Sequence, residues 1–199
     1  DYWSNSVDGT GEYALTISQS CEAACNGLEC GYDGCEGSCG TCSGNQACVG
    51  GACKALSASG ESCNQPFEIF HGLGTFYANG DTSNASPDVT HSAADCGFTG
   101  TTADGPDHVY AFNVQADGLY TATLGIPDAG VDLALWIATD CTDTANTCIG
   151  GSDVPNFGEG EEVVTFTAQA GERYYVVVDS SYIEGGKEAG PYTLTIKGE

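Results

Sequence analysis

Residues 106–124 read PDHVYAFNVQADGLYTATL, and this stretch decides the fold class of the chain. Two runs within it, 108–114 and 118–124, alternate in the manner of half-buried β-strands, whose side chains point to opposite faces in turn. Both runs are rich in the aromatic and β-branched residues that favour strands. The turn sequence ADG at 116–118 separates them. We therefore predict two strands here.

Further runs of the same kind fill the rest of the segment from residue 63 to residue 199. They are residues 66–71, 75–79, 131–138, 162–168, 173–179 and 192–197. Turn residues separate these runs, and no stretch shows helical periodicity over more than about two turns. Short strands with this spacing predict an all-β fold, a β-sandwich.

The chain is strongly acidic, with 28 Asp and Glu against 4 Lys and Arg and a formal charge of −24. This excess repels phosphate backbones and anionic lipid headgroups, so we expect no nucleic acid as a partner. The sequence contains no apolar run of 18 residues, so we expect no membrane insertion. The charge attracts cations, and a salt-adapted surface and a set of calcium sites both explain it.

Twelve cysteines and the absence of methionine indicate a secreted or cell-surface protein that uses disulfides as staples. The chain does not begin with the basic and apolar regions of a signal peptide. We therefore expect any export signal to lie upstream of Asp1 and to have been removed.

The composition divides the chain into four segments: 1–20, 21–53, 54–62 and 63–199. The second segment holds the cysteines Cys21, Cys25, Cys30, Cys35, Cys39, Cys42, Cys48 and Cys53. It has too little aliphatic material for a core, so we predict a small disulfide-rich module without much regular structure. Its pairing stays open, because eight cysteines allow about 105 pairings. The third segment reads as a linker.

The sandwich segment holds the four remaining cysteines. Cys141 and Cys148 bracket a short loop, so we expect a local bridge between them. Cys63 and Cys96 are then left, and we expect them to join each other. Two such bridges would restrict the unfolded state of a domain that carries much negative charge.

Residues 11–18, GEYALTIS, are similar to residues 190–197, GPYTLTIK. Tyr13, Leu15 and Ile17 lie on one face of the predicted first strand, and an isolated strand leaves this face and its backbone groups unpaired. The strand folds back on its own chain, belongs to an upstream sandwich of the same polypeptide, inserts into a neighbouring copy, or resembles the last strand by chance. Insertion into a neighbour is heterologous and builds a fibre.

Four ordered stretches carry a resemblance to a known family. They are residues 105–124, 131–141, 163–181 and 190–196. Together they make residues 63–197 resemble the bacterial pre-peptidase C-terminal domain. The resemblance implies a jelly-roll sandwich and a non-catalytic accessory role in secreted proteins, and some members bind calcium or polymeric substrates.

Residues 30–42, CGYDGCEGSCGTC, also resemble a cysteine-rich linker module of large secreted bacterial proteins. Family members usually follow a catalytic domain, and none is visible in this sequence.

Four aspartates at strand edges or in glycine-rich loops are candidate calcium ligands. They are Asp81, Asp107, Asp153 and Asp179. Calcium takes about six to eight oxygen ligands from carboxylates and carbonyls, so these residues form a site if their loops meet. The alternative for each residue is a turn cap or a solvated charge.

Catalysis has little support in the sequence. His71, His91 and His108 are well separated, and neither a GxSxG elbow nor an HExxH pair occurs. We therefore predict a non-catalytic structural or adhesive module, a repeating unit of a cell-surface or secreted array or filament. Its expected partners are neighbouring copies of itself or upstream repeats. The alternative is a substrate- or carbohydrate-binding accessory module of a secreted hydrolase, with a polysaccharide as partner.

Overall fold

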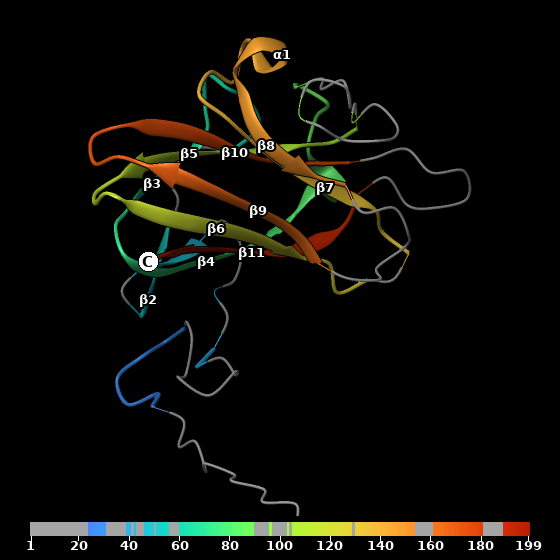
Figure 1. The fold of residues 1–199 in the computed structure, drawn as a ribbon. Helices are drawn as coiled ribbons and strands as arrows, with labels where there is room; N and C mark the ends of the chain where they lie inside the picture. The colour runs from blue at the N-terminus through green and yellow to red at the C-terminus, as the bar shows by residue number, and fades with distance from the viewer. Residues whose placement is uncertain are drawn as a thin grey trace, which may run out of the picture.

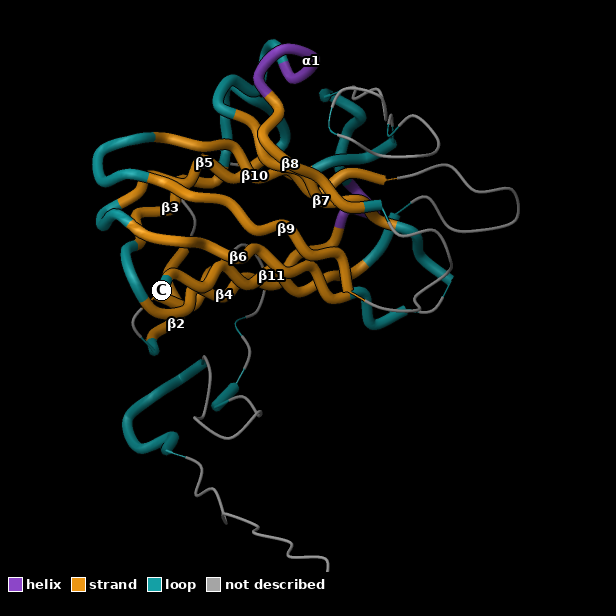
Figure 2. Tube along the Cα trace, in the orientation of Figure 1, coloured by secondary structure: helices purple, strands orange, loops and turns teal. Residues whose placement is uncertain are grey.

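The computed structural model confirms an all-β sandwich with a disulfide-rich module (Figures 1 and 2). It describes residues 24–30, 39–40, 42, 46–49, 51–55, 60–89, 96, 103, 105–128, 130–153, 161–180 and 189–199. The predicted first strand, with Tyr13, Leu15 and Ile17, lies outside these residues, as does His91.

Two sheets form the sandwich. The six-stranded sheet has the order β2 (Ala52–Ala55), β1 (Gln46–Val49), β4 (Gly74–Asp81), β11 (Pro191–Gly198), β6 (Gly118–Gly125) and β9 (Glu161–Ala168). The five-stranded sheet has the order β3 (Phe67–His71), β5 (His108–Val114), β10 (Arg173–Ser180), β7 (Leu133–Ala138) and β8 (Cys148–Ser152). Neighbouring strands are antiparallel, except that β3 and β5 are parallel. Figure 1 shows the two sheets as stacked layers.

All eight predicted runs form strands, with ends that shift by at most two residues. The turn at 116–118 is not a hairpin between neighbours, because it carries the chain from β5 in one sheet to β6 in the other. The Tyr120 hydroxyl donates a hydrogen bond of 2.6 Å to the Ala116 carbonyl and holds this corner. The alternating pattern therefore identified the strands, but not their partners.

The core lies between the sheets and combines aliphatic side chains with several packed aromatic rings. The rings of Phe112 and Tyr120 lie 5.2 Å apart, and those of Phe166 and Tyr174 lie 5.3 Å apart. Each buried aromatic side chain of this kind contributes about 1.5–3 kcal/mol to folding. The outer face of the five-stranded sheet is also covered, since Trp136 and Val177 there are fully buried.

The predicted disulfide pairing of the sandwich is wrong. Cys63 bonds to Cys141, and Cys96 bonds to Cys148. The loop between Cys141 and Cys148 contains helix α1 (Thr144–Thr147), and hydrogen bonds close it in place of a local disulfide. The Thr147 hydroxyl lies 2.8 Å from the Asp140 carbonyl and 2.7 Å from the Asp143 carbonyl. Cys141 and Cys148 instead link this loop to Cys63 and Cys96, which are distant in the sequence.

The disulfide-rich module does contain regular structure. Strands β1 and β2 form a hairpin at its carboxyl end, with Gly51 at a φ of 82° in the turn. Strand β1 then pairs with β4 of the sandwich, through Ala47 with Ala78 and Cys48 with Tyr77. Strand β2 runs to Ala55, into the segment predicted as a linker.

Only two short helical turns occur in the described chain, α1 and the 3-10 turn η1 (Thr82–Asn84). Neither has the length or the apolar character that crossing a bilayer requires.

Candidate cation sites

Asp107 stands directly before β5 and is fully buried. Its Oδ2 accepts hydrogen bonds of 2.8 Å from the backbone N–H groups of Asp88 and Val89. Its Oδ1 has no hydrogen-bond partner among the described atoms. Asp107 thus holds the segment at Asp88 and Val89 against the sheet and keeps one oxygen available.

Burial raises the pKa of Asp107 to about 7, against the lowering effect of the two backbone hydrogen bonds. The nearby charges of Asp88 and Glu61 raise it further. A buried, charged carboxylate with one oxygen left without a hydrogen bond is costly, and a bound cation would offset the cost.

The sheet brings Asp179 opposite Asp107. Val178 of β10 pairs with His108 of β5, so the next opposed residues are Asp179 and Asp107. The Ser180 hydroxyl continues this contact with a hydrogen bond of 2.8 Å to the Pro106 carbonyl. Opposed residues of an antiparallel pair have Cβ atoms about 4.5–5.5 Å apart, so these two predicted acids are neighbours.

Asp81 and Asp153 occupy other places. The Asp81 carboxylate caps η1 by accepting a hydrogen bond of 2.9 Å from the Ser83 N–H, and hydrogen bonds to Ser83 lower its pKa. Asp153 follows β8, two strands away from β10 in the sheet. The four predicted acids are therefore not joined in one site.

Sequence reasoning missed two acids beside Asp153. Asp132, before β7, is 3% exposed, and Glu162, in β9, is 4% exposed. Burial first, and then the charges of Asp153 and Glu162, raise the pKa of Asp132 to about 6. A usable signal was present, because Glu162 shares the inward face of β9 with Val164 and Phe166.

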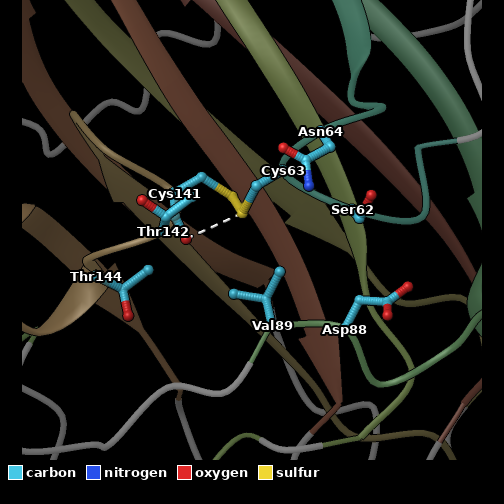
Figure 3. Close-up of a pocket in the computed structure, with 8 residues that line it drawn as sticks. All are labelled: Ser62, Cys63, Asn64, Asp88, Val89, Cys141, Thr142 and Thr144. Atoms are coloured by element: carbon cyan, nitrogen blue, oxygen red, sulfur yellow. Dashed lines mark hydrogen bonds between the residues drawn. A yellow bond between two sulfur atoms is a disulfide. The ribbon is translucent and has the colours of Figure 1, made fainter.

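A polar pocket of about 460 Å³ lies on the outer side of the five-stranded sheet (Figure 3). It is lined by Ser62, Cys63, Asn64, Asp88, Val89, Cys141, Thr142 and Thr144. The disulfide between Cys63 and Cys141 forms part of its wall, and Asp107 positions Asp88 and Val89 from behind. Hydroxyl, amide and carboxylate groups suit a small polar or cationic ligand.

The sulfur atoms of Cys30, Cys42 and Cys53 lie within 4.8 Å of one another. They do not form a metal site, because Cys42 is bonded to Cys53 and Cys30 is also in a disulfide. Cys25 is bonded to Cys39. Cys21 and Cys35, and the side chain of Cys48, lie outside the description.

No protein-family model and no curated protein matches the chain. Among solved structures it is similar to the pre-peptidase C-terminal domain of a collagenase from Bacillus anthracis, the kind of domain that residues 63–197 resemble. The identity is 17%, the match covers 66% of this chain and 96% of that one, and the TM-score is 0.39. It is also similar to PliG from Aeromonas hydrophila, a periplasmic inhibitor of g-type lysozyme, with 13% identity, coverage of 66% and 99%, and a TM-score of 0.39. These are distant similarities, and the function proposed for this chain rests on its own residues.

Proposed function

We propose that this chain is a non-catalytic extracellular module, a rigid structural or adhesive unit that repeats in a cell-surface or secreted array. The observation that carries the proposal is the pairing of β1 with β4. Through this pairing the cysteine-rich module and the sandwich share one sheet. A spacer joined in this way holds successive sandwiches at a fixed orientation, whereas a flexible tether does not.

Side-chain contacts support a rigid joint. Tyr77 of β4 packs against the cluster of Cys30, Cys42 and Cys53. Glu29 adds a second link within the module, because its carboxylate accepts a hydrogen bond of 2.9 Å from the Cys53 N–H. Covalent bonds replace an apolar core here, as is usual in small modules of oxidising compartments.

The environment of His108 favours a non-catalytic role. Its Nδ1 lies 2.7 Å from the Tyr192 hydroxyl inside the sandwich, and burial lowers its pKa. His71 lies near the ring of Phe76. Both histidines thus contact residues of the core, and neither lines the pocket beside Cys63.

Calcium at Asp107 and Asp179 is part of the same proposal. Two buried, opposed carboxylates supply oxygen ligands on the outer face of the sheet. A divalent ion there would offset their charge. It would also stabilise the fold of a chain whose formal charge is −24.

Substitutions in the predicted first strand test whether the chain assembles. The wild-type chain should form end-to-end oligomers as its concentration rises, measured by light scattering and electron microscopy. Leu15→Asp should keep it monomeric, because a charge on the apolar face blocks insertion. Thr16→Asp, which places the same charge on the opposite face, should still assemble. A wild-type chain that stays monomeric at every concentration contradicts the assembly.

A carbohydrate-binding accessory module is the second candidate. A groove of about 430 Å³ on the outer face of the six-stranded sheet favours it. The groove is lined by Thr75, Tyr77, Thr121, Thr123, Thr195, Lys197 and Glu199. Hydroxyl groups and an aromatic ring suit a glycan chain. Micromolar binding of a polysaccharide by a monomeric chain, lost in Tyr77→Ala, would favour this candidate.

A further inference from the structure

The place that β11 occupies in the six-stranded sheet, here called the β11 slot, lies between β4 and β6, and β11 pairs with both. The side chains of Tyr192, Leu194 and Ile196 enter the core from this slot and are at most 1% exposed. The residues between them at 191, 193 and 197 are exposed. The buried positions therefore decide which segment can fill the slot.

The first buried position of the slot needs a hydroxyl group. The Tyr192 hydroxyl lies 2.8 Å from the Tyr110 hydroxyl and 2.7 Å from His108 Nδ1. Both partners belong to β5 of the other sheet, so this contact joins the two layers of the sandwich. A phenylalanine at this position would leave buried polar groups without their partner, and a smaller side chain would leave a cavity.

The entrance of the slot needs a glycine. A Cβ atom added to Gly190 would lie 2.5 Å from Val131 Cγ2, and Val131 is fully buried. The Gly190 backbone is also fixed in place. Its N–H donates a hydrogen bond of 3.1 Å to the Thr82 hydroxyl, and its carbonyl accepts one of 3.0 Å from the Thr82 N–H. A larger residue here would force the packed core apart.

Residues 11–17, GEYALTI, match the slot at every buried position. The residues Gly190, Tyr192, Leu194 and Ile196 have the identical counterparts Gly11, Tyr13, Leu15 and Ile17. The half-buried position 195 is also identical in the two segments, and the two positions that differ, 191 and 193, are exposed. A strand that recurred by chance would keep the apolar pattern, but it would not need this glycine or this tyrosine.

We propose that residues 11–17 of one copy replace β11 in a second copy of this chain, between its β4 and β6. The inference rests on the proposed assembly and names the surface that accepts the first strand. The exchange costs little, because the same residue types fill the buried positions before and after it. Joining two copies loses translational freedom without burying new core, so the exchange depends on protein concentration.

The match also has an end. A Cβ atom added to Gly198 would lie 2.6 Å from the ring of Tyr120, and the residue that corresponds to Gly198 is Gln19. The inserted segment is therefore expected to leave the slot at Ser18, before this close contact.

One exposed position opposes the exchange. Pro191 lies opposite Asp81 of β4, and the residue that corresponds to Pro191 is Glu12. Like charges that face each other across a strand pair repel. The variant Glu12→Gln should therefore assemble at a lower concentration than the wild type.

Light scattering of the full chain, measured against concentration, tests the fit of the buried positions. Gly11→Val should raise the concentration needed for assembly by about tenfold, because its side chain would meet Val131. Tyr13→Phe should raise it by about tenfold through the lost hydroxyl group. Ala14→Thr, which copies the exposed Thr193, should leave it unchanged.

Gly11→Val separates this slot from an ordinary sheet edge. Valine favours a strand more than glycine does, so at an open edge the substitution should help the segment to pair. A loss of assembly therefore points to the close contact with Val131. Gly9→Val, outside the matching segment, is the control and should assemble like the wild type.

Hydrogen exchange in the wild-type assembly gives a second measurement, which needs no variant. The backbone amides of residues 192–196 should lose protection as oligomers form, because β11 is displaced, and those of residues 13–17 should gain it. Dilution of the assembly should reverse both changes.

The exchange and the array can fail separately. A wild-type chain that never assembles contradicts both. A chain that assembles while Gly11→Val and Tyr13→Phe behave like the wild type would overturn the exchange into the β11 slot and leave the array standing. The same holds for an assembly in which residues 192–196 stay fully protected.

Discussion

Ser152 of β8 donates a hydrogen bond of 2.5 Å to Glu162 of β9 and so links the edge strands of the two sheets. The bond supplies a partner to a carboxylate that is 4% exposed. It also places the hydroxyl beside the acids at the ends of β7 and β8. The stability of this edge therefore depends on how the charge of Glu162 is compensated.

Replacing Ser152 by alanine should destabilise the metal-free protein by about 1–3 kcal/mol, because it removes a partner from a buried carboxylate. Urea unfolding of the variant and the wild type measures the difference. Ser86→Ala, at an exposed position, should change the free energy of unfolding by less than about 0.5 kcal/mol. An equal loss of unfolding free energy in both variants would show that the hydrogen bond between Ser152 and Glu162 does not stabilise the fold.

The Tyr192 hydroxyl should contribute strongly to the stability of the folded core. This group lies 2.8 Å from the Tyr110 hydroxyl and 2.7 Å from His108 Nδ1, and both tyrosines are fully buried. Tyr192→Phe keeps the ring but leaves two buried polar groups without their partner, so we expect a loss of about 1–3 kcal/mol. Tyr175→Phe, at a partly buried position, is the matched control. A Tyr192→Phe variant as stable as the wild type would refute the importance of this network.

The disulfide between Cys63 and Cys141 spans 78 residues and should stabilise the fold by about 2–5 kcal/mol. The double variant Cys63→Ala/Cys141→Ala should unfold at a correspondingly lower denaturant concentration. Peptide mapping of the oxidised wild type should find Cys63 with Cys141 and Cys96 with Cys148. A peptide that links Cys141 to Cys148 would disprove this arrangement.

The metal-free protein should become less stable as the pH rises from 5 to 8. Burial raises the pKa of Asp107 to about 7 and that of Asp132 to about 6, from an ordinary value of 3.8. Between 3.8 and these values the two carboxyl groups bind more protons in the folded protein than in the unfolded chain, so they make the free energy of unfolding fall with increasing pH. The lowered pKa of His108 acts in the opposite direction and reduces the size of this fall. The melting temperature, measured after removal of metal by dialysis, checks this trend. Asp107→Asn/Asp132→Asn should flatten it, and a steeper fall in that variant would contradict the assignment.

The strands were predictable because each alternating run buries one face. Strand β9 shows this pattern along its whole length, from exposed Glu161 to buried Ala168. Strand β8, with the sequence CIGGS, was missed because two glycines replace the alternation and pairing with β7 supplies its stability. The hairpin of β1 and β2 was missed although a glycine pair separates its strands, a pattern typical of tight turns.

The candidate sites were harder to predict, because they depend on which strands become neighbours. Asp107 and Asp179 are 72 positions apart in the sequence and meet only through the pairing of β5 with β10. Asp132 reads as part of the run 131–138, and its burial depends on packing that alternation does not reveal. The pairing of Cys141 with Cys63 likewise follows from tertiary contacts, not from spacing.

Hydrogen exchange of the backbone amides in β1 and β4 tests the central claim most directly, because a rigid unit requires the two strands to open together. Within the paired strands, the amides of Ala47, Cys48, Tyr77 and Ala78 should be protected to a similar degree and lose protection together in denaturant. Rapid exchange throughout β1 and β2 while β4 stays protected would mean that the cysteine-rich module is a flexible tether, and the proposed rigid unit would be wrong.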